Sequence, residues 1–163
     1  MSLQRNNFVH KDRLNSSVEN LKLPLQLSEI KEIVVDVRRQ FEQHLVDDDL
    51  LIQLYHNYNP KVENVKLFVE SAKELFPNLN CGLATVYLKE CLQMGRIVNG
   101  EYNGENHTFL LIEDGLKEPF LVDITSDQYG GPDIYIGPIV TPWKVKTFSE
   151  EEYHLKQVNL TSY

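Results

Sequence analysis

The chain contains only two cysteines, Cys81 and Cys91, and so small a number excludes a disulfide framework. If both lie on one continuous helix, almost three turns separate them by about 15 Å, far beyond the reach of a disulfide bond. We therefore expect two free thiols. Any special chemistry at either one must come from its surroundings.

Long apolar runs and an excess of basic residues are also missing. No apolar stretch approaches the roughly 20 residues that span a bilayer, and residues 1–7 lack the apolar centre of a signal peptide. Lys and Arg total 16 against 24 Asp and Glu, a formal net charge of -8, whereas binding of nucleic acid requires a basic surface. We expect a cytoplasmic protein, unless a leader has been removed, that spans no membrane and binds no nucleic acid.

The length and composition predict one folded domain. A chain of 163 residues with 42% hydrophobic and 10% aromatic residues can bury a core, but it is too short for two comfortable domains. We interpret residues 1–163 as a single domain, in which residues 1–27 form an arm and residues 80–137 a catalytic core.

Three helices are predicted before Cys81 from apolar residues at helical spacing. The first begins after Ser28 as N-cap, and its charged residues, including Arg38 and Glu42, are expected to face solvent. The second and third cover residues 50–58 and 62–76. The acidic run at residues 47–49 lacks the alternating spacing and the glycine of a calcium loop, so we interpret it as helix capping or solvated surface rather than a metal site.

A fourth helix is predicted to begin at Asn80-Cys81-Gly82. Pro77 breaks the preceding helix because it has no amide hydrogen and clashes with the previous turn. One buried stripe follows from Cys81 to Leu92. At a helix start, free amides and the helix dipole stabilise a thiolate and lower its pKa, which is one requirement for a cysteine nucleophile. The alternative is that Cys81 is simply a small buried apolar residue.

The hydrophobic period changes to that of strands after Gly95. Residues 96–102 read as a strand with a bulge or turn at Gly100, residues 103–106 as a turn, and residues 107–113 and 119–125 as an antiparallel hairpin. Further strands are expected within residues 133–139 and 140–148. Both hairpin strands are apolar on both faces, so we expect the sheet to be covered on two sides, with helices on one of them. The predicted fold class is α+β, with N-terminal helices and the cysteine-bearing helix packed on an antiparallel sheet.

The length of the hairpin loop decides whether His107 and Asp123 can meet. A loop of three or five residues places His107 opposite Thr125, with Asp123 one diagonal step away on the same face. A loop of two or four residues places His107 and Asp123 on opposite faces. The register is therefore a test of any pairing between them.

A Cys-His-Asp arrangement has a chemical rationale. A thiol with the reference pKa of about 8.5 is mostly protonated at neutral pH, so it gains from an imidazole that takes its proton. The imidazole gains from an acceptor that fixes its tautomer. Asp123 stands among apolar residues, where a carboxylate requires a partner. Taken singly, Asp123 also reads as a turn cap and His107 as a strand-end histidine; the order of all three residues favours the joint interpretation.

The order of these residues resembles the papain-like cysteine fold, specifically its transglutaminase-like branch. The stretches that carry the likeness are Asn80-Cys81-Gly82, residues 107–112 and residues 120–125. In that branch an aromatic residue stands two positions after the histidine and a threonine two positions after the aspartate, and here Phe109 and Thr125 fill those places. The likeness covers roughly residues 80–137.

The resemblance implies a cysteine-dependent acyl-transfer enzyme without a cofactor. Cys81 would form a thioester, His107 would shuttle the proton and Asp123 would orient His107, as in a peptidase, amidase, deamidase or transglutaminase. The main-chain amide of Cys81 would be one oxyanion donor. The candidates for a second donor are Asn80 and Gln128, and Gln128 and Tyr129 could shape the acyl pocket. The expected partner is a peptide, protein or small amide substrate; its identity and the oligomeric state stay open.

Two alternatives come from other classes of protein. Cys81, His107 and Asp123 are also legitimate zinc ligands of a hydrolase, although they lack the close ligand pairs of common zinc motifs. A non-catalytic binding module of the same fold would carry the same three residues. Sequence alone does not separate this module from the enzyme.

Overall fold

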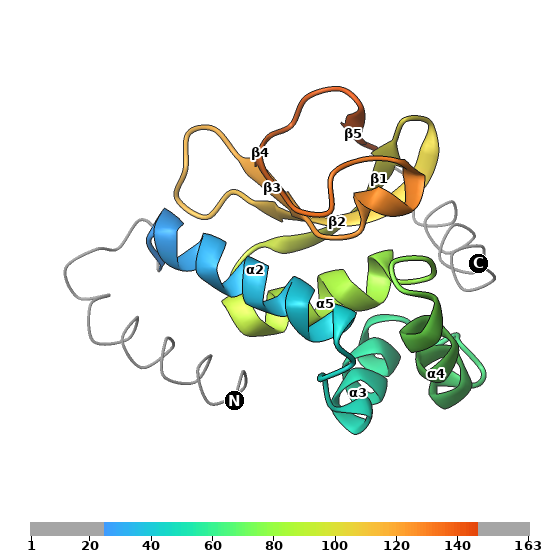
Figure 1. Ribbon diagram of the computed structural model, residues 1–163. Coiled ribbons are helices and arrows are strands. Elements are labelled where there is room, and N and C mark those ends of the chain that lie inside the picture. Colours follow the sequence, from blue (N-terminus) through green and yellow to red (C-terminus); the bar gives the residue numbers. More distant parts are fainter. Residues whose placement is uncertain (1–24, 147–163) are drawn as a thin grey trace.

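The computed structural model describes residues 25–146, so most of the expected arm over residues 1–27 lies outside the described residues. The described chain runs through helices first and strands afterwards (Figure 1). The helices are α2 (Leu27–Glu42), α3 (Asp48–Tyr58), α4 (Val65–Leu75) and α5 (Cys81–Leu92). The strands are β1 (Arg96–Tyr102), β2 (Glu105–Ile112), β3 (Phe120–Asp123), β4 (Tyr135–Pro138) and β5 (Trp143–Val145), and a short 3-10 turn, η1 (Ser126–Tyr129), follows β3.

The strands form one antiparallel sheet in the order β4-β3-β2-β1-β5. Helix α5 packs against β1 and β2, while α2 and α3 contact α5 from the helical side. Figure 1 shows this layering, with α2 and α5 running beneath the sheet and α3 and α4 farther from it. The predicted α+β class, with helices packed on an antiparallel sheet, is confirmed.

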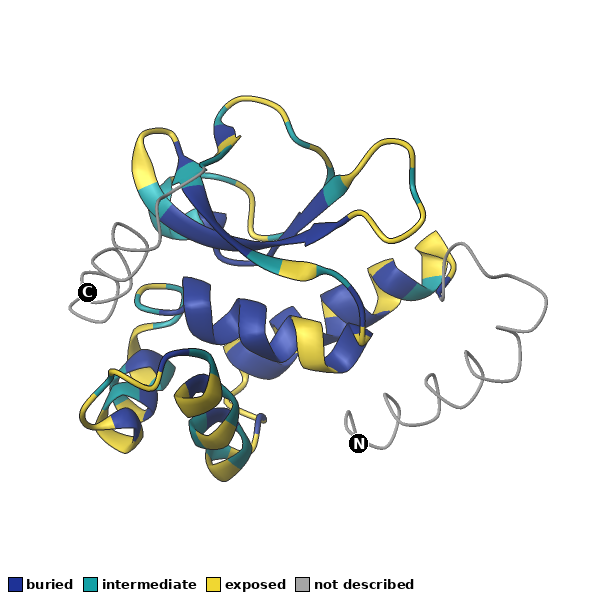
Figure 2. Cartoon of the chain, turned by 180° about the vertical axis from the view of Figure 1, so that it is seen from behind, coloured by how far each residue is buried: buried dark blue, intermediate teal, exposed yellow. Residues whose placement is uncertain are grey.

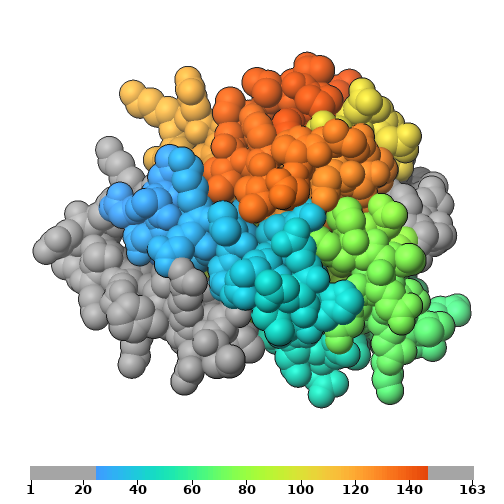
Figure 3. Space-filling model, in the orientation of Figure 1, coloured from blue at the N-terminus to red at the C-terminus, as the bar shows by residue number. Residues whose placement is uncertain are grey.

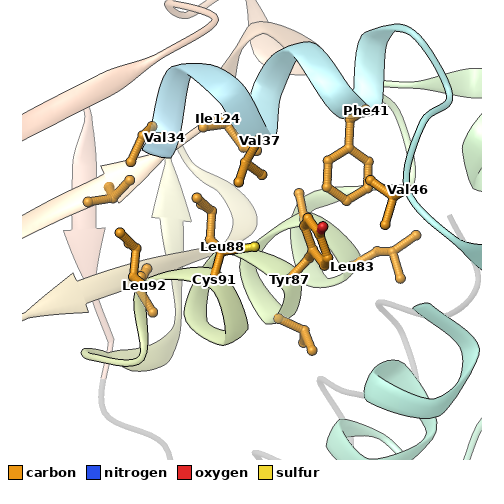
Figure 4. Packing of buried hydrophobic residues seen from close by; sticks show 14 of the residues in the cluster. Val34, Val37, Phe41, Val46, Leu83, Tyr87, Leu88, Cys91, Leu92 and Ile124 are labelled. Atoms are coloured by element: carbon orange, nitrogen blue, oxygen red, sulfur yellow. The ribbon is translucent and has the colours of Figure 1, made fainter. Parts of the chain in front are cut away.

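Helix α5 is the centre of the core. The expected single buried stripe is too narrow a description, because every residue from Cys81 to Leu88 is buried. A helix enclosed between a sheet and other helices is apolar all round. Figure 4 shows Val37 and Phe41 of α2 directed at Leu88 and Tyr87 of α5. In Figure 2 this helix is dark blue along most of its length, whereas α3 and α4 have yellow outer faces.

The starts of the other helices follow local capping chemistry. Helix α2 begins two residues earlier than expected, because Gln26 and not Ser28 is its N-cap. The carboxylate of Glu29 accepts the main-chain N–H of Gln26 at 2.9 Å. Asp47 accepts the N–H of Leu50 at 3.0 Å and caps α3, in agreement with the capping interpretation of the acidic run.

The first hairpin is regular, and the expected bulge at Gly100 is absent from the described ladder. Gly100 pairs with His107 on one side and with Val145 of β5 on the other. A Cβ atom there would lie 2.4 Å from the carbonyl oxygen of Lys144 and 2.9 Å from the ring of Phe109. Close approach of neighbouring strands therefore explains this glycine. The turn consists of Asn103 and Gly104, both at positive φ.

The second hairpin has the register that the shorter odd loops predicted. Leu110 pairs with Val122 and Ile112 with Phe120. Continued along both strands, this register places His107 level with Thr125. The connection is longer than expected, but it holds an odd number of residues, and the alternation of faces is preserved. His107 and Asp123 consequently share a face.

That shared face is the one directed away from the helices. Alternation along β2 places Leu110 and Ile112 in the core with α5, and it places His107 and Phe109 on the other side of the sheet. A second buried cluster covers this side, as the two apolar faces predicted. Its members are Val98, Tyr102, Phe109, Leu111, Leu121 and Trp143.

Candidate active site

Cys81 is the first residue of α5 and is 3% exposed. The N–H groups of a first helical turn have no partner within the helix, so they create a positive end around Cys81. Asn80, expected as a second oxyanion donor, has a different use in the structure. Its amide nitrogen donates to the carbonyl oxygens of Ala72 and Asn78 at 2.8 and 2.7 Å. Asn80 therefore anchors the loop before α5 instead of presenting its amide to a substrate.

The first turn of α5 reaches β2 where β3 has ended. Strand β3 stops at Asp123, which stands level with Phe109, so the edge of β2 beyond Phe109 has no neighbour in β3. Thr85 fills part of this gap, because its hydroxyl contacts the carbonyl oxygens of Thr108 at 3.3 Å and of Cys81 at 2.6 Å. Cys81, one turn before Thr85, brings its thiol to His107 and Thr108.

His107 and Asp123 form a buried pair. The Nε2 atom of His107 lies 2.7 Å from Oδ2 of Asp123, and the two side chains are 0% and 1% exposed. The other ring nitrogen, Nδ1, is not used by Asp123. It is therefore the nitrogen that can face Cys81 and Gln128. The rings of Tyr102, Phe109 and Tyr129 surround the imidazole with centroid distances of 6.3, 6.2 and 5.5 Å.

Three further groups hold the carboxylate of Asp123. Trp143 Nε1 donates to Oδ2 at 2.8 Å, and the main-chain N–H of Thr125 donates to Oδ1 at 2.9 Å, with the Thr125 hydroxyl at 3.5 Å. Trp143 is itself fixed by stacking on Tyr135, with ring centroids 3.9 Å apart. These donors form hydrogen bonds with a buried carboxylate whose burial would otherwise cost free energy. They also fix the orientation of that carboxylate toward His107.

The site stabilises a thiolate beside an imidazolium. Burial alone would raise the pKa of Cys81, but the hydrogen bond and charge of His107, together with the main chain and hydroxyl of Thr108, outweigh burial and lower that pKa. Burial likewise opposes charging of His107, but the charge and hydrogen bond of Asp123, with a smaller effect of Cys81, raise the pKa of His107 to about 10. At neutral pH His107 is therefore charged, and its charge favours the thiolate form of Cys81.

The predicted pocket residues Gln128 and Tyr129 lie on η1, next to His107. Gln128 Nε2 is 3.3 Å from His107 Nδ1, so its carboxamide faces the same nitrogen as Cys81. The hydroxyl of Tyr129 donates to the carbonyl oxygen of Asn106 at 3.1 Å, while its ring meets the imidazole edge to face. Gln128 thus lies beside His107 Nδ1, and the ring of Tyr129 lies beside the imidazole.

Arg38 of α2 fixes the turn that carries these two residues. Contrary to the expectation of a solvated face, Arg38 is buried. Its Nη1 and Nη2 atoms hold the carboxylate of Asp127 at 2.9 and 2.8 Å, and Nη1 also donates to the carbonyl oxygen of Ile124 at 2.7 Å. Figure 3 shows the orange segment after β3 lying directly against the blue helix α2. Arg38 therefore holds the chain after Asp123 both just before η1, at Ile124, and within η1, at Asp127.

We expect Asp127→Asn to lower the free energy of unfolding by about 1.5 kcal/mol, because it removes the charge from the two-pronged contact with the buried guanidinium. Glu42→Gln is the matched control, since Glu42 binds the same Arg38 at 3.1 Å but its side chain is 47% exposed. That exposed pair is worth less than about 0.5 kcal/mol. Urea denaturation followed by circular dichroism measures both values. Equal losses in the two variants would contradict a special role for Asp127.

The described chain offers no ready metal site or membrane span. Within residues 25–146, no three His, Cys, Asp or Glu side chains gather in a way that could hold a metal ion. None of the helices in this range has the length and apolar character needed to cross a bilayer. Comparison of the chain with models of protein families, with curated proteins and with solved structures gave no significant match.

Proposed function

We propose that this protein is a cysteine-dependent acyl-transfer enzyme with a papain-like core of the transglutaminase-like branch. The observation that carries the proposal is the buried chain of contacts from Cys81 through His107 to Asp123, in which His107 is bonded at 2.7 Å to a carboxylate held by further donors. A histidine needed only for packing would not require so many groups to hold its partner.

The reaction follows from the charges of the resting pair. The Cys81 thiolate attacks the carbonyl carbon of an amide, forming a carbon–sulfur bond and placing negative charge on the carbonyl oxygen. The main-chain N–H of Cys81 at the helix start stabilises that oxyanion, and the amide of Gln128 is the second donor. When the carbon–nitrogen bond breaks, His107 gives its Nδ1 proton to the leaving amine. A thioester on Cys81 remains.

Release of the acyl group reverses the roles. His107, now neutral, takes a proton from water or from an acceptor amine, which attacks the thioester carbonyl. The carbon–sulfur bond breaks and the thiolate returns beside the imidazolium. Asp123 stays hydrogen-bonded to Nε2 throughout, so that only Nδ1 exchanges the proton.

A non-catalytic binding module is the second candidate, and one observation favours it. Cys81 is 3% exposed and His107 is 0% exposed, so little of the site is open to solvent in this conformation. The two candidates differ in whether the sulfur can be acylated.

Acylation of Cys81 by 4-nitrophenyl acetate is the direct test. We expect a burst of one nitrophenolate per chain and transfer of one acetyl group to the peptide that carries Cys81, measured by absorbance and mass spectrometry. Cys81→Ala should reduce that burst at least about 100-fold, because the nucleophile is gone. Cys91→Ala is the matched control and should leave it unchanged, since Cys91 lies in the core between α2 and α5, as Figure 4 shows. Absence of any acetyl group on Cys81 would favour the binding module.

A further inference from the structure

Asn99 of β1 is a buried carboxamide that has lost its hydrogen bonds to water without replacing them. It is 5% exposed, and among the described residues neither Oδ1 nor Nδ2 has a hydrogen-bond partner. The hydroxyl of Thr108, which is 0% exposed, lies against the Cys81 thiol but has no nitrogen or oxygen partner within that range. Buried polar groups are nearly always paired, so two adjacent exceptions require an explanation.

These two side chains stand side by side. Asn99 and Thr108 are directly opposed in the ladder between β1 and β2. The Thr108 carbonyl oxygen contacts the Thr85 hydroxyl of α5, so its main-chain groups point away from β1. Asn99 and Thr108 therefore form the closer, non-hydrogen-bonded type of pair, in which side chains on the shared face are in contact range.

The pair belongs to the face on which Cys81 sits. Alternation places Asn99 with Ile97, and Thr108 with Leu110, on the side of the sheet covered by α5. Thr108 also touches the Cys81 thiol, and Asn99 is the next side chain across the sheet from Thr108. Asn99 at 5% and Cys81 at 3% both keep a small contact with the surface. The unpaired groups are thus a lateral extension of the candidate active site.

A leucine of nearly the same shape would fill the place of Asn99 without leaving polar atoms unpaired. A carboxamide is therefore favourable at this position only when a ligand forms hydrogen bonds with it. A carboxamide has both donors and an acceptor, and the group that matches it offers the same two functions. A peptide or side-chain amide does so, whereas an ester offers acceptors only.

We propose that Asn99 and Thr108 form a subsite that binds an amide group of the acyl substrate next to Cys81. Asn99 Nδ2 and the Thr108 hydroxyl donate to the carbonyl oxygen of that amide, and Asn99 Oδ1 accepts from its N–H. The subsite makes the enzyme selective for substrates that carry an amide over those that carry only ester groups. This inference rests on the proposed function, because it needs Cys81 to be a reactive nucleophile.

The test compares two alkylating reagents that differ in this one respect. Iodoacetamide presents an amide beside the reacting carbon, and ethyl iodoacetate presents an ester; in both cases the sulfur displaces iodide. The rate of modification of Cys81 in the full chain is measured by mass spectrometry for each reagent. Asn99→Leu is expected to lower the ratio of the iodoacetamide rate to the ester rate roughly 3- to 10-fold, the effect of one or two lost hydrogen bonds. The same variant should raise the melting temperature, since a buried unpaired group is removed.

Two further variants keep the experiment decisive. Thr108→Val should lower the ratio in the same direction and serves where Asn99→Leu fails to fold. Asn57→Leu, on the exposed surface of α3, is the matched control and should leave the ratio unchanged. An unchanged ratio in both Asn99→Leu and Thr108→Val, with Cys81 still reactive, overturns the subsite and leaves the proposed function standing. A Cys81 that reacts with neither reagent overturns the proposed function and the subsite together.

Discussion

Replacing His107 by alanine is expected to slow the alkylation of Cys81 by iodoacetamide at pH 6 by at least about tenfold. His107 is the largest favourable influence on the Cys81 thiolate, and without it only Thr108 opposes the effect of burial, which raises the pKa of this thiol. A thiol with a pKa of about 8.5 is less than about 1% thiolate at pH 6. The lower intrinsic nucleophilicity of a low-pKa thiolate compensates for part of this difference, so the net loss is smaller than the change in thiolate fraction.

The shape of the pH profile is the sharper measurement. In the parent chain the rate should stay high to a lower pH than in the variant, because the pKa of Cys81 is lowered. In His107→Ala the rate should rise only above about pH 8.5. Mass spectrometry separates Cys81 from Cys91, which is buried in the core and should stay unmodified in both chains. Identical profiles in parent and variant would show that His107 does not control the thiol.

The meeting of Cys81, His107 and Asp123 was predictable because each residue has a local signal. A break at Pro77 locates a helix start, and alternation along two strands limits where a histidine and an aspartate can lie. The observed register places His107 level with Thr125, as an odd loop requires, and this parity is independent of the exact loop length. Local rules were sufficient where each step concerned neighbours along the chain or one hairpin.

The groups that hold the site from farther away were not predictable in the same way. Trp143 is separated from Asp123 by 20 residues and Arg38 from Asp127 by 89. Nothing in the neighbourhood of Trp143 shows that its indole donates to a carboxylate. A charged residue on an amphipathic helix is normally solvated, so Arg38 carried no sign of its buried partner.

Contacts between distant parts of the chain also explain the difference between the two expected oxyanion donors. Asn80 and Gln128 both carry an amide, and both stand close in sequence to a residue of the candidate triad. Asn80 donates to carbonyl oxygens of α4 and of the loop before α5. Gln128 instead lies beside His107, on a turn that Arg38 of α2 fixes. Which amide lies beside His107 depends on the packing of distant elements. Sequence position alone did not distinguish them.

Asp123→Ala should have the largest effect on stability, a loss of about 3–5 kcal/mol in the free energy of unfolding at pH 7. The substitution leaves the His107 imidazole buried without its counter-ion and deprives Trp143 Nε1 and the Thr125 N–H of their acceptor. Asp123→Asn keeps an acceptor oxygen and the shape of the side chain, so its loss should be smaller. Asp114→Asn, on the exposed loop between β2 and β3, is the matched control and should change the value by less than about 0.5 kcal/mol.

The dependence of stability on pH separates the charge of Asp123 from its packing. Because Asp123 raises the pKa of His107 from an ordinary value near 6.5 to about 10, the imidazolium stabilises the folded chain fully below pH 6.5, and this contribution is lost as the pH rises to 10. Cys81 contributes with the opposite sign, so the measurement is made in a Cys81→Ala background by urea denaturation between pH 6 and pH 10. We expect the free energy of unfolding to fall across this range with Asp123 present and to vary much less in Asp123→Asn, where the pKa of His107 returns toward its ordinary value. If both chains lose stability in parallel, the carboxylate supports His107 by packing and hydrogen bonding alone, and the charged pair proposed for catalysis does not exist.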